Sequence, residues 1–278
     1  MGRIQSLAQA RNQRGVLIAA HRGMAAGNIP CNTIGAFEAA LKQGADILET
    51  DVILNKEGKM FIFHTRQEKN HLNQDIKLEE MTEEEILAQR FVNTDNAPTP
   101  YGILTLDAFL EIFKNRCLIN LDHGWGFLSQ LTAAVRRHGM ADQVLLKAPA
   151  KLEYARQMEA AAPEMMFMPI YKNVDELTPQ LETMDVNFAG AELVFSEEDS
   201  PLVQADYIRS HHEKGRILWC NPIVYSMKAV LTAGHTDDAA IMGDPEFGWG
   251  WLIDKGFDIL QTDWVMPLRG FLDNRKQK

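Results

Sequence analysis

The sequence contains few cysteines, and their spacing excludes the usual cysteine-based scaffolds. Cys31, Cys117 and Cys220 are an odd number of thiols, spread widely over 278 residues. This pattern suits neither a disulfide framework nor a zinc ribbon. A reducing compartment is therefore the simpler interpretation.

Long apolar runs are also missing. No stretch approaches the roughly 20 apolar residues that are needed to cross a bilayer. The apolar run at 16–20 is much shorter than the core of a secretory signal, and it ends at His21-Arg22. We therefore expect no transmembrane segment and a cytoplasmic location.

Basic residues are scarce relative to acidic ones. The chain has 28 Lys and Arg against 38 Asp and Glu, which gives a formal net charge of -10. Nucleic acids and anionic membranes need clustered basic residues, so neither is an expected partner. The acidic excess also fits carboxylates that gather around a cation. We expect a small-molecule substrate, and the sequence leaves the oligomeric state open.

Short apolar runs alternate with longer amphipathic segments, which is typical of βα units around a parallel sheet. Eight such units predict an α/β fold, the TIM (β/α)8 barrel. The predicted strands are 16–20, 46–54, 117–121, 143–147, 165–170, 188–195, 216–220 and 258–261. The predicted helices are 33–43, 106–114, 128–138, 152–161, 174–184, 201–214 and 249–255.

One segment interrupts this alternation after the second strand. Residues 54–58 form a turn between two apolar stretches, which predicts a hairpin. A symmetric hairpin brings His64 opposite Thr50 and beside the neighbouring carboxylates. Residues 65–101 then form an insertion. We predict one domain over residues 1–278, with an insertion at about 52–104.

The ends of the first two strands carry candidate functional residues. His21 and Arg22 end the first strand, where TIM barrels build active sites, although such a pair is often structural. Glu49 and Asp51 lie two residues apart on the second strand, so their carboxylates point to the same side. A divalent metal ion between them, Mg²⁺ or Ca²⁺, would offset their repulsion. The alternative is a solvated pair with basic partners.

The third and fourth strands add two more candidates. Asp122 either supplies a third carboxylate or caps the following helix. Lys147 ends an apolar strand, where a charged residue should meet an anion. The set suits phosphoester chemistry, in which a metal and fixed cations hold a phosphate while one histidine acts as base and the other as acid.

The sequence resembles the glycerophosphodiester phosphodiesterase family. The shared motifs are Ala-His-Arg-Gly at 20–23, Pro-Cys-Asn-Thr at 30–33, Gly-Ala-Asp at 44–46, Glu-Thr-Asp-Val at 49–52, Lys-Glu-Gly at 56–58, Phe-His at 63–64, Gly-Phe-Asp-Ile at 256–259 and Thr-Asp at 262–263. The resemblance implies a TIM barrel with a small insertion after the second strand. It also implies metal-dependent hydrolysis of a glycerophosphodiester to glycerol 3-phosphate and an alcohol.

The resemblance also implies roles for individual residues. His21 and His64 would be the acid–base pair, and Arg22 would bind the phosphate. The metal ligands would be Glu49, Asp51 and Asp122, and a substrate contact to the glycerol would come from Trp219.

Several positions depart from the family pattern. Cys31 stands where the family usually has Glu, and Thr65 stands where Asp is common. Asp122 replaces a longer Glu in the metal site. Gly124 replaces a basic residue, whose charge Lys147 could supply.

Two other functions fit the same residues. One is a phospholipase D or sphingomyelinase D-like barrel enzyme that acts on lipid head groups. The other is a non-catalytic barrel that binds a phospho-ligand, although both histidines and both second-strand acids are intact.

Overall fold

The predicted TIM barrel is confirmed in the computed structural model, which describes residues 7–276. Eight parallel strands form a closed ring, because β1 pairs with β11 on one side and with β2 on the other. All eight predicted strands are found with small shifts at their ends. They are β1 (Leu17–Ala20), β2 (Ile47–Leu54), β6 (Leu118–Asp122), β7 (Val144–Pro149), β8 (Met166–Lys172), β9 (Gly190–Val194), β10 (Ile217–Cys220) and β11 (Ile259–Thr262).

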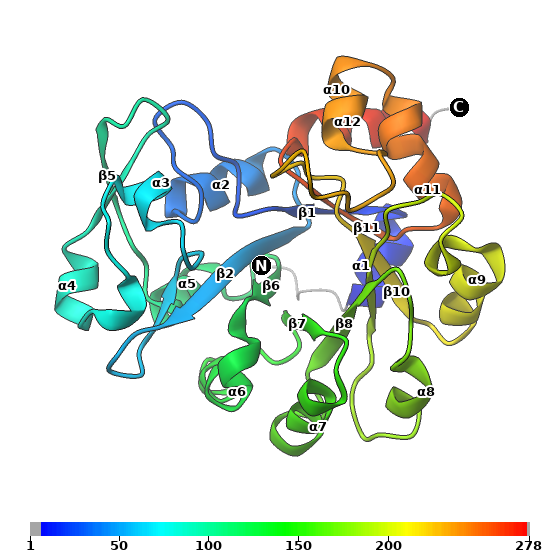
Figure 1. Ribbon diagram of the computed structural model, residues 1–278, viewed down its shortest axis with the longest axis horizontal. Helices are drawn as coiled ribbons and strands as arrows, with labels where there is room; N and C mark the ends of the chain where they lie inside the picture. Colours follow the sequence, from blue (N-terminus) through cyan, green and yellow to red (C-terminus); the bar gives the residue numbers. More distant parts are fainter. Residues whose placement is uncertain (1–6, 277–278) are drawn as a thin grey trace.

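Helices surround this ring (Figure 1). Side-chain caps begin two of them, since Thr33 accepts from Ala36 N and Thr105 accepts from Ala108 N. The helices are α1 (Leu7–Arg14), α2 (Ile34–Lys42), α5 (Leu106–Phe113), α6 (Leu128–Arg137), α7 (Leu152–Ala161), α8 (Thr178–Leu181), α9 (Ala205–Glu213), α10 (Asp237–Met242), α11 (Trp251–Lys255) and α12 (Val265–Arg275). Among residues 7–276, no helix combines the length and the apolar character that spanning a bilayer requires.

The helix predicted at 174–184 is wrong. Only α8 is helical there, and Pro179 lies in its first turn. In a helix that began at 174, the ring of Pro179 would clash with the carbonyl group of Asp175. The side chain of Asp175 instead accepts a hydrogen bond from Leu177 N at 3.1 Å, which forms a turn before the short helix.

Two other predicted helices are interrupted. The segment 201–214 begins with a 3₁₀ turn at Pro201–Val203, and extended backbone at Gln204 separates this turn from α9. The segment 249–255 overlaps a π-helical turn at Glu246–Gly250 that leads into α11. Both predictions have the right location but the wrong internal geometry.

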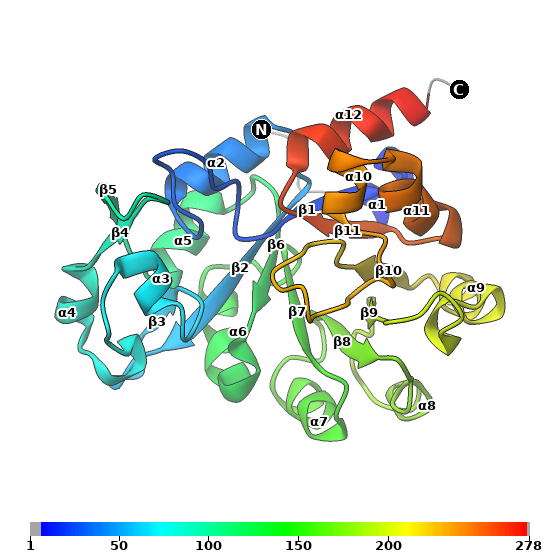
Figure 2. The same ribbon diagram turned by 45° about the horizontal axis from the view of Figure 1, so that its top comes forward.

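The segment after β2 leaves the barrel and packs on its own apolar cluster. The hairpin is confirmed, because β3 pairs antiparallel with β2 in the register Val52↔Ile62. The segment contains β3 (Met60–Ile62), α3 (Glu68–Leu72), a 3₁₀ turn (Leu78–Glu80), α4 (Glu83–Leu87), β4 (Arg90–Val92) and β5 (Pro98–Gly102). Its cluster includes Phe61, Phe63 and Phe91. Figures 1 and 2 both show α3, α4 and β5 to one side of the barrel.

Side chains fill the barrel interior in layers, because alternate residues of each strand point inward. An apolar layer includes Leu17, Ile47, Leu118, Leu145, Met166, Ile217 and Ile259. Two residues further along the strands, several inward positions are polar or charged, namely Glu49, Asn120, Lys147 and Gln261. The interior is therefore apolar toward the start of the strands and polar toward their carboxyl ends.

We expect Gly190→Ala to destabilise the barrel by about 3 kcal/mol or more, because overpacking a tight site forces the backbone to shift. A Cβ atom at Gly190 would lie 1.8 Å from the carbonyl oxygen of Ile217 on β10. The free energy of unfolding in urea measures this effect. Gly270→Ala is the matched control, because no atom lies within 4 Å of its added Cβ. Equal stability of the two variants would contradict the close strand approach.

Candidate active site

The predicted site residues converge at the carboxyl ends of neighbouring strands. Asp51 on β2 lies beside Asp122 on β6 in the strand register, and Glu49 lies beside Asn120. His21 follows β1, next to β2. Side chains from separate parts of the sequence therefore surround one end of the barrel.

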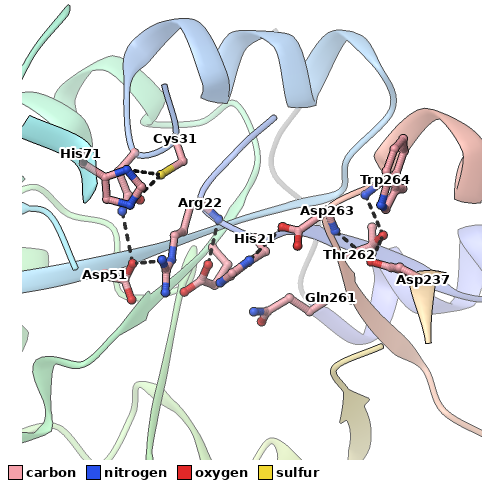
Figure 3. Close-up of polar contacts among 12 residues, drawn as sticks. His21, Arg22, Cys31, Asp51, His71, Asp237, Gln261, Thr262, Asp263 and Trp264 are labelled. Atoms are coloured by element: carbon pink, nitrogen blue, oxygen red, sulfur yellow. Dashed lines mark hydrogen bonds and ion pairs between the residues drawn. The ribbon is translucent and has the colours of Figure 1, made fainter. Parts of the chain in front are cut away.

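His21 has a carboxylate partner that the sequence analysis did not assign. Its Nδ1 lies 2.9 Å from Asp263 Oδ1. Both side chains are labelled in Figure 3. Burial alone would lower the pKa of His21, but the bond to Asp263 and the charge of Glu49 raise it above its usual value. The imidazolium form is thereby favoured.

A buried aspartate fixes the position of Asp263. Asp237 Oδ2 accepts from the backbone N–H of Asp263 at 3.0 Å and from Thr262 Oγ1 at 2.9 Å. Its other oxygen accepts from Trp249 Nε1 at 2.7 Å. The Thr-Asp motif at 262–263 was the only sequence signal for this arrangement. Nothing in the sequence marked Asp237.

Arg22 contacts both acids of β2. Its backbone N–H donates to Glu49 Oε2 at 2.9 Å, and its Nε lies 2.9 Å from Asp51 Oδ2. Asn32 also donates to Asp51 Oδ2, at 3.2 Å, and accepts from Thr50 Oγ1. Figure 3 shows the guanidinium group between Asp51 and His21. The cation is thus held directly beside the carboxylates.

The two acids of β2 differ in electrostatic environment. Burial, together with the charges of Asp51 and Asp122, raises the pKa of Glu49 to about 8. Burial would also raise the pKa of Asp51, but the charges of Arg22 and the nearby histidines together outweigh it and lower that pKa below the usual range. Glu49 is therefore the acid whose charge is least compensated by protein groups.

The three predicted ligands offer the oxygen donors that a hard divalent cation prefers. Among residues 7–276, however, they do not form a cluster in which one ligand atom of each lies within 4.8 Å of the other two. Glu49 uses Oε2 to accept from Arg22, and Asp122 uses Oδ1 to accept from the backbone N–H of His123 at 2.9 Å. Within residues 7–276, their other oxygens accept no hydrogen bond. A cation near Asp51 would offset the repulsion that raises the pKa of Glu49. The predicted capping by Asp122 and a ligand role are thus compatible, since each uses a different oxygen.

The hairpin brings His64 to Asp51, as its register predicts. Phe63 N donates to the backbone oxygen of Asp51 at 3.1 Å, which extends the strand pairing toward His64. His64 Nδ1 lies 2.7 Å from the carbonyl oxygen of Thr65. Burial, with the charge of Arg22, lowers the pKa of His64. This environment favours a neutral imidazole with its proton on Nδ1.

A second histidine at this position was missed by sequence reasoning. The ring centroid of His123 lies 4.6 Å from that of His64, and its Nε2 lies 3.8 Å from Asp51 Oδ1. The sequence suggested a cap or a ligand at Asp122 but gave no signal that the imidazole of the next residue would lie close to Asp51 on β2.

Lys147 lies inside the barrel and meets a protein anion. Its ammonium group is 2.6 Å from Glu192 Oε2 and 4.1 Å from the ring centroid of Trp219. Burial alone would lower the pKa of Lys147, but Glu192 and Asp122 raise it above its usual value. The predicted anion partner is found, but it is a buried glutamate. The phosphate-binding role of Lys147 stays a prediction.

Trp219 lies beside Lys147 inside the barrel. Its side chain is fully buried inside the barrel, and its Nε1 donates to Asn221 Oδ1 at 2.8 Å. Trp219 packs against the ammonium group of Lys147. Its contact with a glycerol group stays a prediction.

We expect Glu192→Gln to destabilise the fold by about 3 kcal/mol, because it leaves Lys147 buried without its anion. The double variant Lys147→Met with Glu192→Gln should recover much of this loss, since it removes the unpaired charge. Urea denaturation measures both effects. Glu164→Gln, which breaks an exposed pair with Arg136, is the control and should change stability by less than about 1 kcal/mol. A Glu192→Gln variant as stable as this control would contradict the assigned pairing.

Comparisons with known proteins agree with this architecture. The family model that matches the chain is described as a domain of unknown function and covers residues 153–272. A glycerophosphodiester phosphodiesterase of Bacillus altitudinis is 42% identical over 111 residues, which are 38% of this chain and 44% of that protein. The chain spans about half the length of the curated relatives it matches.

Solved structures share the fold over nearly the whole chain. A glycerophosphoryl diester phosphodiesterase from Parabacteroides distasonis has a TM-score of 0.74 at 20% identity, covering 94% of this chain and 87% of that one. The chain resembles the glycerophosphodiester phosphodiesterases. An Oleispira antarctica phosphodiesterase, solved in complex with the product sn-glycerol-3-phosphate, has a TM-score of 0.63 at 17% identity and covers 92% of this chain and 96% of that one. The fold common to these phosphodiesterases is thus present in this chain.

Proposed function

We propose that the protein hydrolyses a glycerophosphodiester to glycerol 3-phosphate and an alcohol. The observation that carries the proposal is that two histidines near Asp51 have hydrogen-bond partners that favour different protonation states. His21 is bonded to a carboxylate, whereas His64 is bonded to a backbone carbonyl. Both histidines act electrostatically on Asp51. An acid and a base on two sides of one site are what hydrolysis of a phosphodiester requires.

The partners suggest which histidine acts as base. With its proton on Nδ1, His64 has a free lone pair on Nε2 that can take a proton from the attacking water. His21 is favoured in its charged form by Asp263, so its Nε2 can donate a proton. The water oxygen forms the new bond to phosphorus while the bond to the alcohol oxygen breaks. The alcohol oxygen keeps the bonding electrons and takes the proton of His21, and solvent exchange then restores both histidines.

Charge on the phosphate is balanced by cations at the same end of the barrel. Arg22 would bind a phosphate oxygen, since its guanidinium lies between Asp51 and His21. Glu49, Asp51 and Asp122 would hold a divalent ion such as Mg²⁺ or Ca²⁺. Such an ion, when bound, would supply further stabilisation of the negative charge that grows on the phosphate oxygens.

An assay for glycerol 3-phosphate tests the proposal. The purified chain is incubated with glycerophosphocholine, glycerophosphoethanolamine and glycerophosphoglycerol, with added Mg²⁺ or Ca²⁺, and glycerol 3-phosphate is measured by coupled dehydrogenase. We expect release from at least one substrate. No release from any substrate with either ion would contradict the proposed function.

A further inference from the structure

We propose that Asp51, His64 and His123 form a binding site for a transition ion such as Zn²⁺, and that an ion bound there inhibits hydrolysis. One ligand atom from each of the three side chains lies within 4.8 Å of the other two. The set differs from the three carboxylates described above because it contributes two imidazole nitrogens. The inhibitory half of the inference rests on the proposed function, whereas the binding half does not.

Each ligand atom is oriented by its other contacts. Because His64 Nδ1 donates to the carbonyl oxygen of Thr65, Nε2 is left as the ligand atom. The two carboxylate oxygens of Asp51 have different neighbours. Oδ2 contacts Arg22 and Asn32, whereas Oδ1 lies 3.8 Å from His123 Nε2. A metal bound at Oδ1 would therefore leave the contact with Arg22 in place.

The backbone holds His123 over this position. Its φ of 59° is left-handed, and its N–H donates to Asp122 at 2.9 Å. Its ring packs 4.7 Å from that of Trp125, measured between centroids. Its side chain is 31% exposed, against 2% for Asp51, so the imidazole has room to move while the carboxylate is fixed.

The donor atoms and their distances favour a transition ion. Imidazole nitrogen with one carboxylate suits Zn²⁺, whereas Mg²⁺ and Ca²⁺ prefer oxygen. Tetrahedral Zn²⁺ with bonds of about 2.0 Å places its ligand atoms about 3.3 Å apart. The 3.8 Å between His123 and Asp51 therefore needs a shift of only about 0.5 Å. A cavity of about 560 Å³ borders His64 and Trp125 and gives an ion access from solvent.

Binding there would block the base. Once the lone pair of His64 Nε2 is donated to an ion, it can no longer accept a proton from water. Asp51 would also be a ligand in both sites, the Zn²⁺ site and the Mg²⁺ or Ca²⁺ site that it forms with Glu49 and Asp122. Zn²⁺ should therefore inhibit hydrolysis that Mg²⁺ or Ca²⁺ supports.

Calorimetric titration with Zn²⁺ tests the binding half on the tag-free full chain after chelator treatment. We expect binding of one ion, with affinity lowered about tenfold or more in His123→Asn. Asparagine suits this change because it tolerates the left-handed backbone. His138→Asn removes an imidazole that pairs with Asp107 on the surface, and it should bind Zn²⁺ as the wild type does. Mg²⁺ affinity should be unchanged in both variants.

Hydrolysis in saturating Mg²⁺ with added Zn²⁺ tests the inhibitory half. We expect Zn²⁺ to inhibit the wild type and His138→Asn, and His123→Asn to need about tenfold or more Zn²⁺ for equal inhibition. Inhibition equal in all three proteins, or none in the wild type, would overturn this half. If no substrate is hydrolysed but Zn²⁺ binding depends on His123, the proposed function fails and the site stands.

Equal Zn²⁺ affinity in the wild type and His123→Asn would overturn the site itself. Circular dichroism checks that each variant is folded. Should His123→Asn fail to fold, His64→Gln replaces it in the titration only, where it should show the same loss of Zn²⁺ affinity. Visible absorption of bound Co²⁺ gives a second readout, because the band of a nitrogen-ligated ion should be lost together with Zn²⁺ affinity.

Discussion

Replacing His21 with asparagine is expected to lower kcat for glycerophosphodiester hydrolysis by about 10²- to 10⁴-fold, the usual contribution of a positioned acid. The asparagine amide can still donate to Asp263, so the local hydrogen bond is retained while the transferable proton is lost. The fold should be unaffected. Initial rates of glycerol 3-phosphate release at saturating substrate measure the effect.

His64→Gln should cause a comparable loss, because it removes the base instead of the acid. His138 lies at the end of α6, where it pairs with Asp107. The variant His138→Asn is the control, and its kcat should match that of the wild type. Asp263→Asn should lower kcat less than His21→Asn, since Asp263 only stabilises the charged imidazole. Near-normal turnover in either His21→Asn or His64→Gln would exclude the acid–base assignment.

Removal of divalent ions is expected to reduce hydrolysis to the background rate. Without an ion, Glu49, Asp51 and Asp122 repel one another and repel the phosphate. Adding Mg²⁺ or Ca²⁺ after dialysis against EDTA should restore the rate. Asp51→Asn should be poorly restored by either ion, because it loses a ligand charge that the other two acids cannot supply.

A stability measurement accompanies the rate. An ion that binds only the folded protein raises the melting temperature, and this shift should be smaller in Asp51→Asn than in the wild type. Glu164→Gln on the surface serves as the control for loss of one negative charge. Full activity in metal-free buffer would contradict the proposed metal dependence.

The barrel could be predicted from the sequence because its strands are short apolar runs separated by amphipathic helices. The errors fell where local chemistry overrides the pattern. Pro179 shortens α8. The last helix, α12, which contains Pro267 near its start, was not predicted. The helix α10 has only six residues, so it spans too few turns for periodicity to reveal it.

The site could be predicted only where strand geometry fixes it. Alternation on β2 places Glu49 and Asp51 together, and the hairpin register brings His64 to them. The partner of Lys147 lies 45 residues further along the chain, on β9, so no local pattern could identify it. His123 was not predicted as a site residue, because the direction of its side chain depends on the left-handed backbone conformation of His123 itself.

The same limit applies to the support of His21. Asp237 accepts a hydrogen bond from the backbone N–H of Asp263, which lies 26 residues further along the chain. The start of α10 and the residues after β11 come together only in the folded barrel. Closure of the ring thus determines contacts that sequence spacing does not encode. Strand alternation gave the candidate ligands, whereas tertiary packing gave the groups that orient them.

Phosphorus NMR of the reaction products tests the central claim most directly. Glycerophosphoethanolamine, or the best substrate in the head-group panel, is incubated with the Mg²⁺-loaded protein and followed to completion. We predict one phosphorus product, glycerol 3-phosphate, with none formed by His64→Gln on the same timescale. A phosphorylated head group, a cyclic phosphate as the final product, or substrate that remains unchanged would contradict the account.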